Sequence, residues 1–257
     1  MDDDPFESPK LLLDRAKEHL ADFAKRESAF FDRQPYTQFI DKEANPGWDT
    51  YVIRFTAKVP GSLATVCADV VNNLRHSLDQ ALCASVLALT GKMPRDTYFP
   101  FGENAEDLER RIANVCKRVA PEVVNFIRGL HPHRGANTPN LLWAMNKISG
   151  ANKHRVLSPM ATSSTGVVQV KSFEGFGTTG VPLGKWNSEK NELEAAMLRP
   201  GIKPNYSLQF SMFVALYNED SQLSGPAAGI LSLMGGFTKE ALDGIESETH
   251  KLLGSRP

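Results

Sequence analysis

The sequence predicts an α+β fold, in which a layer of long helices packs with a mostly antiparallel β-sheet in a single domain. Apolar residues recur every three or four positions in long segments near both ends and in the middle of the chain, a spacing typical of amphipathic helices. Segments in which apolar and polar residues alternate lie on both sides of the middle block. Short, hairpin-like spacing between these segments favours antiparallel pairing.

The helical layer is expected to comprise residues 8–31, 62–150 and 226–253. Gly91 follows the apolar stripe of the segment that starts at residue 62, and is the expected C-cap of that helix. Pro121 and Pro139 mark the starts of two shorter helices, because proline fits the first helical turn. Ser62 and Thr138 are the expected N-caps. A basic helix is expected from Asn104 to Val119.

The sheet is expected to come from residues 36–59 and 155–217. In the first region, two alternating arms flank Asn45-Pro46-Gly47, which predicts a hairpin. In the second region we expect strands at 156–161, 167–173, 193–198 and 206–217. Residues 175–190 are rich in Gly and Thr, and we expect them to form a surface loop.

Composition favours a cytoplasmic protein with no membrane contact. No apolar run approaches the roughly 20 residues of a membrane span, and the acidic start Met1-Asp2-Asp3-Asp4 is unlike a signal peptide. Three cysteines without a CxxC motif indicate free thiols rather than disulfides or structural zinc. The net charge is −1, but residues 108–155 hold nine Lys or Arg against two Glu, a net charge of +7. This basic segment is either an attractor of anionic partners or only a solvated face.

Two polar motifs stand in apolar surroundings: Asn72–Gln80 (NNLRHSLDQ) and Asn152–Arg155 (NKHR). Burying such side chains costs several kcal/mol unless they find partners, so we expect the two motifs to meet in one site. Arg75 and Asp79 are four residues apart and can pair on one helix face. The expected binding residues are Asn73, Asp79, Asn152 and Lys153. The expected catalytic residues are His154, His76, Arg75 and Arg155.

The two motifs, together with Phe99-Pro100-Phe101 and Leu142-Trp143, resemble the pattern of a family of uncharacterised bacterial proteins. The resemblance covers about residues 10 to 160 and departs at Gln80, where the family has a histidine. More weakly, the helix resembles HEPN domains, whose ribonuclease members carry an arginine and, four to six residues later, a histidine. This resemblance implies an HEPN-like helical layer, but Gln80 interrupts the motif that would imply catalysis.

The leading functional hypothesis is that the protein binds RNA or a nucleotide-like anion where the two polar motifs meet. If it cleaves RNA, His154 or His76 would move the proton of the attacking 2′-hydroxyl, and Arg75 or Arg155 would stabilise the phosphate. No segment has the ligand spacing of a metal site and no nucleotide-binding loop is present, so we expect no metal and no cofactor. The competing hypothesis is a scaffold protein in which both motifs form a structural polar network. A homodimer is left open.

Overall fold

The computed structural model describes residues 4–135, 140–154, 166–173, 180–187, 190, 192–200, 208–218 and 223–255. Its helices are α1 (Glu7–Phe31), α2 (Gly61–Thr90), α3 (Ala105–Val115), α4 (Pro121–Gly129), α5 (Leu141–His154) and α6 (Ala227–Gly254). Its strands are β1 (Tyr36–Asp41), β2 (Asp49–Phe55), β3 (Gly166–Phe173), β4 (Gly180–Asn187), β5 (Glu192–Leu198), β6 (Leu208–Asn218) and β7 (Leu223–Pro226). The predicted α+β class is confirmed.

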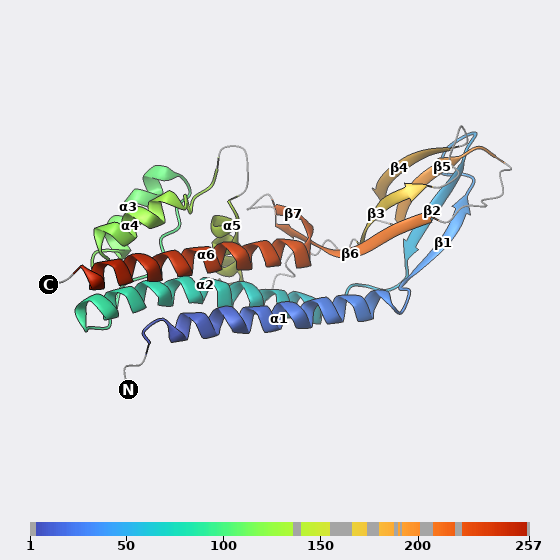
Figure 1. The fold of residues 1–257 in the computed structure, drawn as a ribbon. Coiled ribbons are helices and arrows are strands. Elements are labelled where there is room, and N and C mark those ends of the chain that lie inside the picture. The colour runs from blue at the N-terminus through green and yellow to red at the C-terminus, as the bar shows by residue number, and fades with distance from the viewer. Residues whose placement is uncertain are drawn as a thin grey trace.

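Three long helices form the body of the molecule, with α2 between α1 and α6 (Figure 1). The apolar stripe of α2 supplies the centre of this bundle, where Leu74, Leu78 and Leu82 have almost no exposed surface. Gly91 ends α2 in the left-handed conformation, with φ +67°, as its position in the sequence predicts. The stripe of α2 therefore fixes the bundle axis, against which the shorter helices pack.

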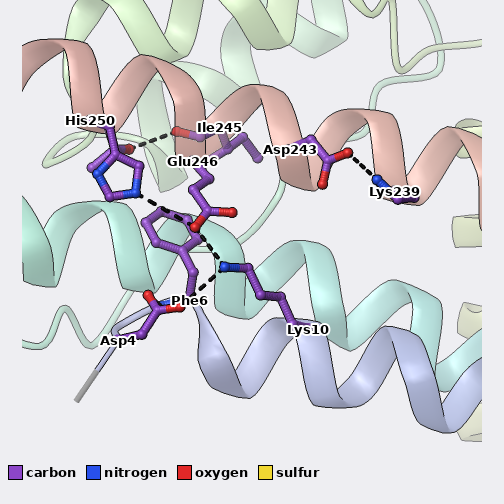
Figure 2. A network of polar contacts seen from close by, with 9 residues as sticks. Asp4, Phe6, Lys10, Lys239, Asp243, Ile245, Glu246 and His250 are labelled. Carbon is purple, nitrogen blue, oxygen red and sulfur yellow. Dashed lines mark hydrogen bonds and ion pairs between the residues drawn. The ribbon is translucent and has the colours of Figure 1, made fainter.

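Polar contacts tie the start of the chain to the end of α6 (Figure 2). The Lys10 Nζ atom lies 2.6 Å from Glu246 Oε1 and 3.1 Å from Asp4 Oδ2. Asp4 Oδ1 also accepts a hydrogen bond from the Phe6 backbone N–H, and the buried Phe6 ring has its centroid 6.2 Å from that of His250. These contacts hold the first turn of α1 against the last turns of α6.

The shorter helices differ from the expected boundaries at their ends. The helix expected to run from Asn104 to Val119 ends at Val115, because a turn at Cys116 closes it before Pro121 starts α4. Ser62 is not the N-cap of α2, which starts after Pro60 without a side-chain cap. The predicted cap Thr138 and the helix start at Pro139 lie outside the described residues.

The four-stranded sheet has the order β1-β2-β5-β4, and a second group has the order β3-β6-β7. Every described strand pair is antiparallel, as predicted, and Tyr36 lies opposite Phe55 in the expected first hairpin. Arg54 on β2 donates from Nε to Glu192 Oε1 on β5 across 2.6 Å. The sheet has its own small hydrophobic cluster, formed by Ile53, Phe55, Leu193 and Ala195.

The prediction of a loop at 175–190 is wrong, because β4 (Gly180–Asn187) lies within it and pairs with β5. Val181 and Trp186 lie opposite Met197 and Leu193, so pairing with an apolar neighbouring strand outweighs the Gly- and Thr-rich composition. A register shift between Pro182 and Lys185 interrupts the ladder of hydrogen bonds, since Pro182 has no backbone N–H to donate. The strand expected at 156–161 lies outside the described residues.

The four-stranded sheet lies beyond one end of the helical bundle, next to the end of α1 and the start of α2 (Figure 1). β6 links the two parts, because Val214 and Leu216 belong to the main helical core. Glu27 on α1 fixes this link, since its Oε1 accepts a hydrogen bond from the Val214 backbone N–H across 2.6 Å. The first polar motif lies within α2, away from this link.

Candidate functional site

The site is built around Arg75, which α2 directs toward α5 and the segment 98–101. Its guanidinium nitrogen Nε donates to Asn146 Oδ1 on α5 across 3.0 Å, and its buried Nη1 forms an ion pair with Asp79. The guanidinium carbon lies 4.9 Å from the centroid of the Phe101 ring, within cation–π range. Only 13% of the Arg75 side chain is exposed, so this cation is held in a defined position.

Asp79 holds the segment 98–101, which lines one side of the site, in place. Besides pairing with Arg75, its Oδ1 accepts a hydrogen bond from the Phe99 backbone N–H across 2.8 Å. Phe99 and Phe101 are buried with ring centroids 5.0 Å apart, while Tyr98 beside them is 47% exposed. The predicted pair of Arg75 and Asp79 exists, and it also connects α2 with the segment 98–101.

A cavity of about 150 Å³ opens beside Arg75. Its lining comes from α2, α3, α5 and the segment 98–101: Arg75, Arg111, Val115, Asn146, Tyr98, Phe99, Pro100 and Phe101. Two arginines and an asparagine thus contribute to a lining whose other residues are aromatic or apolar. Arginine forks of this kind recognise carboxylate and phosphate groups.

Asp107 positions Arg111 in the first turns of α3. Asn104 caps this helix by accepting from the Asp107 N–H, and Asp107 Oδ2 in return accepts from the Glu103 N–H across 2.9 Å. The same carboxylate accepts hydrogen bonds from Arg110 Nη2 and Arg111 Nε. The Glu103 N–H and then the two guanidinium groups hold the pKa of Asp107 far below its usual range. Asp107 therefore stays charged at any physiological pH.

The charges around the cavity leave an excess of one positive charge. Arg75, Arg110 and Arg111 are opposed by the carboxylates of Asp79 and Asp107. Neither carboxylate is part of the cavity lining, whereas Arg75 and Arg111 both are. The described lining contains no histidine, carboxylate or thiol that could move a proton.

The other polar residues of the first motif bind within the protein. Asn72 Oδ1 accepts from Ser149 Oγ on α5, Asn73 Nδ2 donates to the Asp69 carbonyl, and Gln80 accepts from Ser8. His76 is exposed and is not part of the lining. The structure thus places Arg75 in the cavity lining and Asp79 in contact with Arg75, whereas Asn73 and His76 are not part of the lining.

The second motif lies further along α5. The pairs Arg75–Asn146 and Asn72–Ser149 show that α5 runs antiparallel to α2. His154 is eight residues beyond Asn146, which is about 12 Å along the helix axis. The side chains of Asn152, Lys153 and His154 and the whole of Arg155 lie outside the described residues, so a site shared by the two motifs stays a prediction.

Asn146, Arg111 and Tyr98 are site residues that sequence reasoning did not single out. Asn146 had a detectable signal, since it interrupts the apolar face of α5 between Met145 and Ile148, both buried. Arg111 had none, because it is one basic residue among nine in its region. Only the packing of α3 brings Arg111 to the cavity.

Cys67, Cys83 and Cys116 are free thiols, as expected. Burial raises the pKa of Cys67 to about 12 and that of Cys116 to about 11, so neither thiol is an activated nucleophile. Within the described residues, no group of three His, Cys, Asp or Glu side chains is arranged to hold a metal ion.

None of the described helices combines the length and the apolar character needed to cross a membrane. Comparison with models of protein families found no matching family, and no curated protein and no solved structure matches the chain.

Proposed function

We propose that the protein binds RNA through phosphate contacts centred on the cavity between Arg75 and Arg111. The observation that carries this proposal is the largely buried Arg75 side chain, which lines a hollow together with a second arginine, Arg111. A buried cation is costly to maintain, and burying it beside a cavity rather than in solid packing leaves donors free for a ligand. The basic segment 108–155 supports the proposal, because it includes most of α3 and all of α4 and α5 and attracts a polyanion toward the cavity.

Binding of single-stranded RNA to the full chain, followed by fluorescence anisotropy at low and moderate salt, tests this function. Affinity should fall steeply as salt rises, because each phosphate contact releases condensed counterions. Arg111→Gln should weaken binding by about tenfold, equivalent to roughly 1.4 kcal/mol. Arg15→Gln is the matched control, since Arg15 is an exposed arginine on α1 that pairs with Glu18 and is not in the cavity lining.

Equal losses in the two variants would show that only net charge matters, and would remove the cavity from the proposal. Absence of binding at low salt by folded protein would favour the second candidate function, a scaffold protein. That candidate has its own support, since Asn72, Asn73, Arg75, Asp79 and Gln80 all have partners within the protein. A network of this kind stabilises a helix bundle without any ligand.

Cleavage of the bound RNA is a separate hypothesis. It requires His154 or His76 as the proton carrier, and the lining of the cavity provides neither. Labelled RNA incubated with the protein in the presence of a chelator tests it. Cleavage that is lost in His154→Ala, while RNA affinity and the melting curve persist, would identify a proton-transfer residue. Cleavage that survives both His154→Ala and His76→Ala would exclude this mechanism.

A further inference from the structure

The volume of the cavity limits which part of an RNA it can hold. A volume of about 150 Å³ is sufficient for a phosphate group with its oxygens. A nucleotide is larger than this hollow, so the rest of the RNA would lie outside it. An internal phosphate would need chain to leave on both sides of it, whereas a terminal phosphate needs a single exit.

The free donors of the two arginines also favour a terminal phosphate. Arg75 uses Nε on Asn146 and Nη1 on Asp79, and Arg111 uses Nε on Asp107. Each guanidinium has five N–H groups, so the Nη2 end of Arg75 and both Nη ends of Arg111 have no other partner among the described contacts. A phosphate monoester carries a charge of about −1.5 to −2 at pH 7. An internal diester has only two terminal oxygens, whereas a monoester offers three acceptor oxygens to the unpaired guanidinium ends.

Tyr98 provides a surface for the nucleotide that would follow the terminal phosphate. It belongs to the cavity lining, yet 47% of it is exposed, in contrast to its buried neighbours Phe99 and Phe101. An exposed aromatic ring next to a phosphate site is the usual platform on which a nucleobase of single-stranded RNA stacks. The Asp79 bond to the Phe99 N–H fixes the backbone that carries this ring.

We propose that the cavity holds the terminal phosphate monoester of a single-stranded RNA between Arg75 and Arg111, with the terminal base stacked on Tyr98. This rests on the proposed function, because it identifies which phosphate the same cavity selects. The ligand class is the phosphorylated end of a nucleotide chain. The chemistry of the site is the same for a 5′-phosphate and a 3′-phosphate, and the experiment separates the two.

The test compares three RNA oligonucleotides of one sequence in competition against a labelled RNA on the full-length protein: one with a 5′-phosphate, one with a 3′-phosphate and one with hydroxyl groups at both ends. One phosphorylated form should bind at least tenfold more tightly than the hydroxyl form. This advantage should grow from pH 5 to pH 7, because the second ionisation of the phosphate has a pKa of about 6. Arg111→Gln should abolish the advantage and Arg15→Gln should keep it.

Variants at Tyr98 test the stacking contact without touching the bundle core. Tyr98→Phe keeps the ring and should keep the affinity for the phosphorylated RNA, whereas Tyr98→Ala should lower it several-fold. Equal affinity for all three oligonucleotides would overturn the terminal-phosphate inference and leave RNA binding intact. Failure of every oligonucleotide to bind at low salt would overturn both proposals. A phosphate advantage that survives Arg111→Gln would place the end of the RNA outside this cavity.

Discussion

Arg75 and Asp79 are largely removed from water, with 13% and 21% of their side chains exposed. Removing one partner of such a pair leaves a charge without compensation, which costs far more than the pair itself contributes. Asp79 also accepts the hydrogen bond of the Phe99 N–H, so it holds the segment 98–101 in place. The pair therefore fixes the position of the Arg75 guanidinium and connects α2 with the segment 98–101.

We expect Asp79→Ala to lower the free energy of unfolding by about 3 kcal/mol, because it strands the Arg75 guanidinium and leaves the Phe99 N–H unpaired. Urea denaturation of Asp79→Ala, Arg75→Ala and the double variant measures the coupling. The double variant should lose less than the sum of the single losses. Additive losses would show that the two side chains do not interact in solution.

Glu27 predicts a pH dependence of opposite sign to that of an ordinary surface carboxylate. Burial raises its pKa, and the hydrogen bond from the Val214 N–H only partly opposes this. Between the pKa of the unfolded chain and the raised pKa of the folded protein, the folded state binds more protons. The contribution of Glu27 to stability is therefore present at low pH and is lost as the pH rises through the folded pKa.

Glu27→Gln should consequently be at least as stable as the original protein at pH 7, because the amide keeps an oxygen that accepts from the Val214 N–H and carries no charge. The advantage of the variant should shrink as the pH approaches 4.5. Glu27→Ala should lose about 1–3 kcal/mol at pH 7, since it leaves that N–H unpaired. Thermal melts across this pH range measure both effects, and a Gln variant that weakens as pH rises would contradict the sign.

At the scale of elements, two glycines determine how closely helices and turns approach. A Cβ at Gly102 would lie 2.5 Å from the Leu108 backbone N and 2.7 Å from the Asn104 carbonyl oxygen. A Cβ on Gly244 of α6 would lie 1.9 Å from Cζ of the Phe126 ring on α4. The first contact involves backbone that cannot move away, whereas the second involves the tip of a half-buried side chain, which can move by a change in its χ1 angle.

Gly102→Ala should therefore destabilise the protein by about 3 kcal/mol, at the upper end of overpacking costs. It should also weaken ligand binding, because Gly102 joins the segment 98–101 to α3. Gly244→Ala should cost less, about 1 kcal/mol, because the helix propensity of alanine offsets part of the clash. Denaturant melts of both variants provide the comparison. A larger loss for Gly244→Ala would mean that the Phe126 ring is locked between α4 and α6.

At the scale of the whole molecule, the helical bundle and the four-stranded sheet have separate hydrophobic clusters. The bundle cluster joins α1, α2, α5 and α6 with the end of β6, whereas the sheet cluster consists of a few side chains from β2 and β5. Segments with few buried apolar contacts open at lower free energy than the main core. Among the described residues the sheet cluster is the smaller of the two, so we expect the sheet to have the lower local stability.

We expect amide hydrogen exchange to report this difference. The amides of the central turns of α2 and α6 should be protected to near the global free energy of unfolding, and those of β1 and β2 should exchange through an earlier, partial opening. Exchange followed by mass spectrometry measures both sets at once. Uniform protection across bundle and sheet would show instead that the two parts unfold as one cooperative unit.

The sequence by itself determined the order and type of most elements, because hydrophobic spacing and turn residues act locally. The stripe of α2, its end at Gly91 and the hairpin around Gly47 were all predictable from neighbouring residues. The pair of Arg75 and Asp79 was predictable for the same reason, since four residues span one helical turn. Local chemistry also explains the cap of α3, where Asn104 accepts a hydrogen bond from the Asp107 N–H and Asp107 accepts one from the Glu103 N–H.

Only the tertiary structure decided what these elements form together. β4 forms by pairing with β5, whereas the glycines in its own sequence favour a loop. Arg75, Arg111, Asn146 and the segment 98–101 are far apart in the sequence, and the packing of α3 and α5 on α2 brings them around one cavity. His76 belongs to the same motif as Arg75 but faces outward, because adjacent helical positions differ by about 100° around the axis. Periodicity specifies which face of a helix is apolar, whereas the neighbours that meet its polar residues depend on long-range packing.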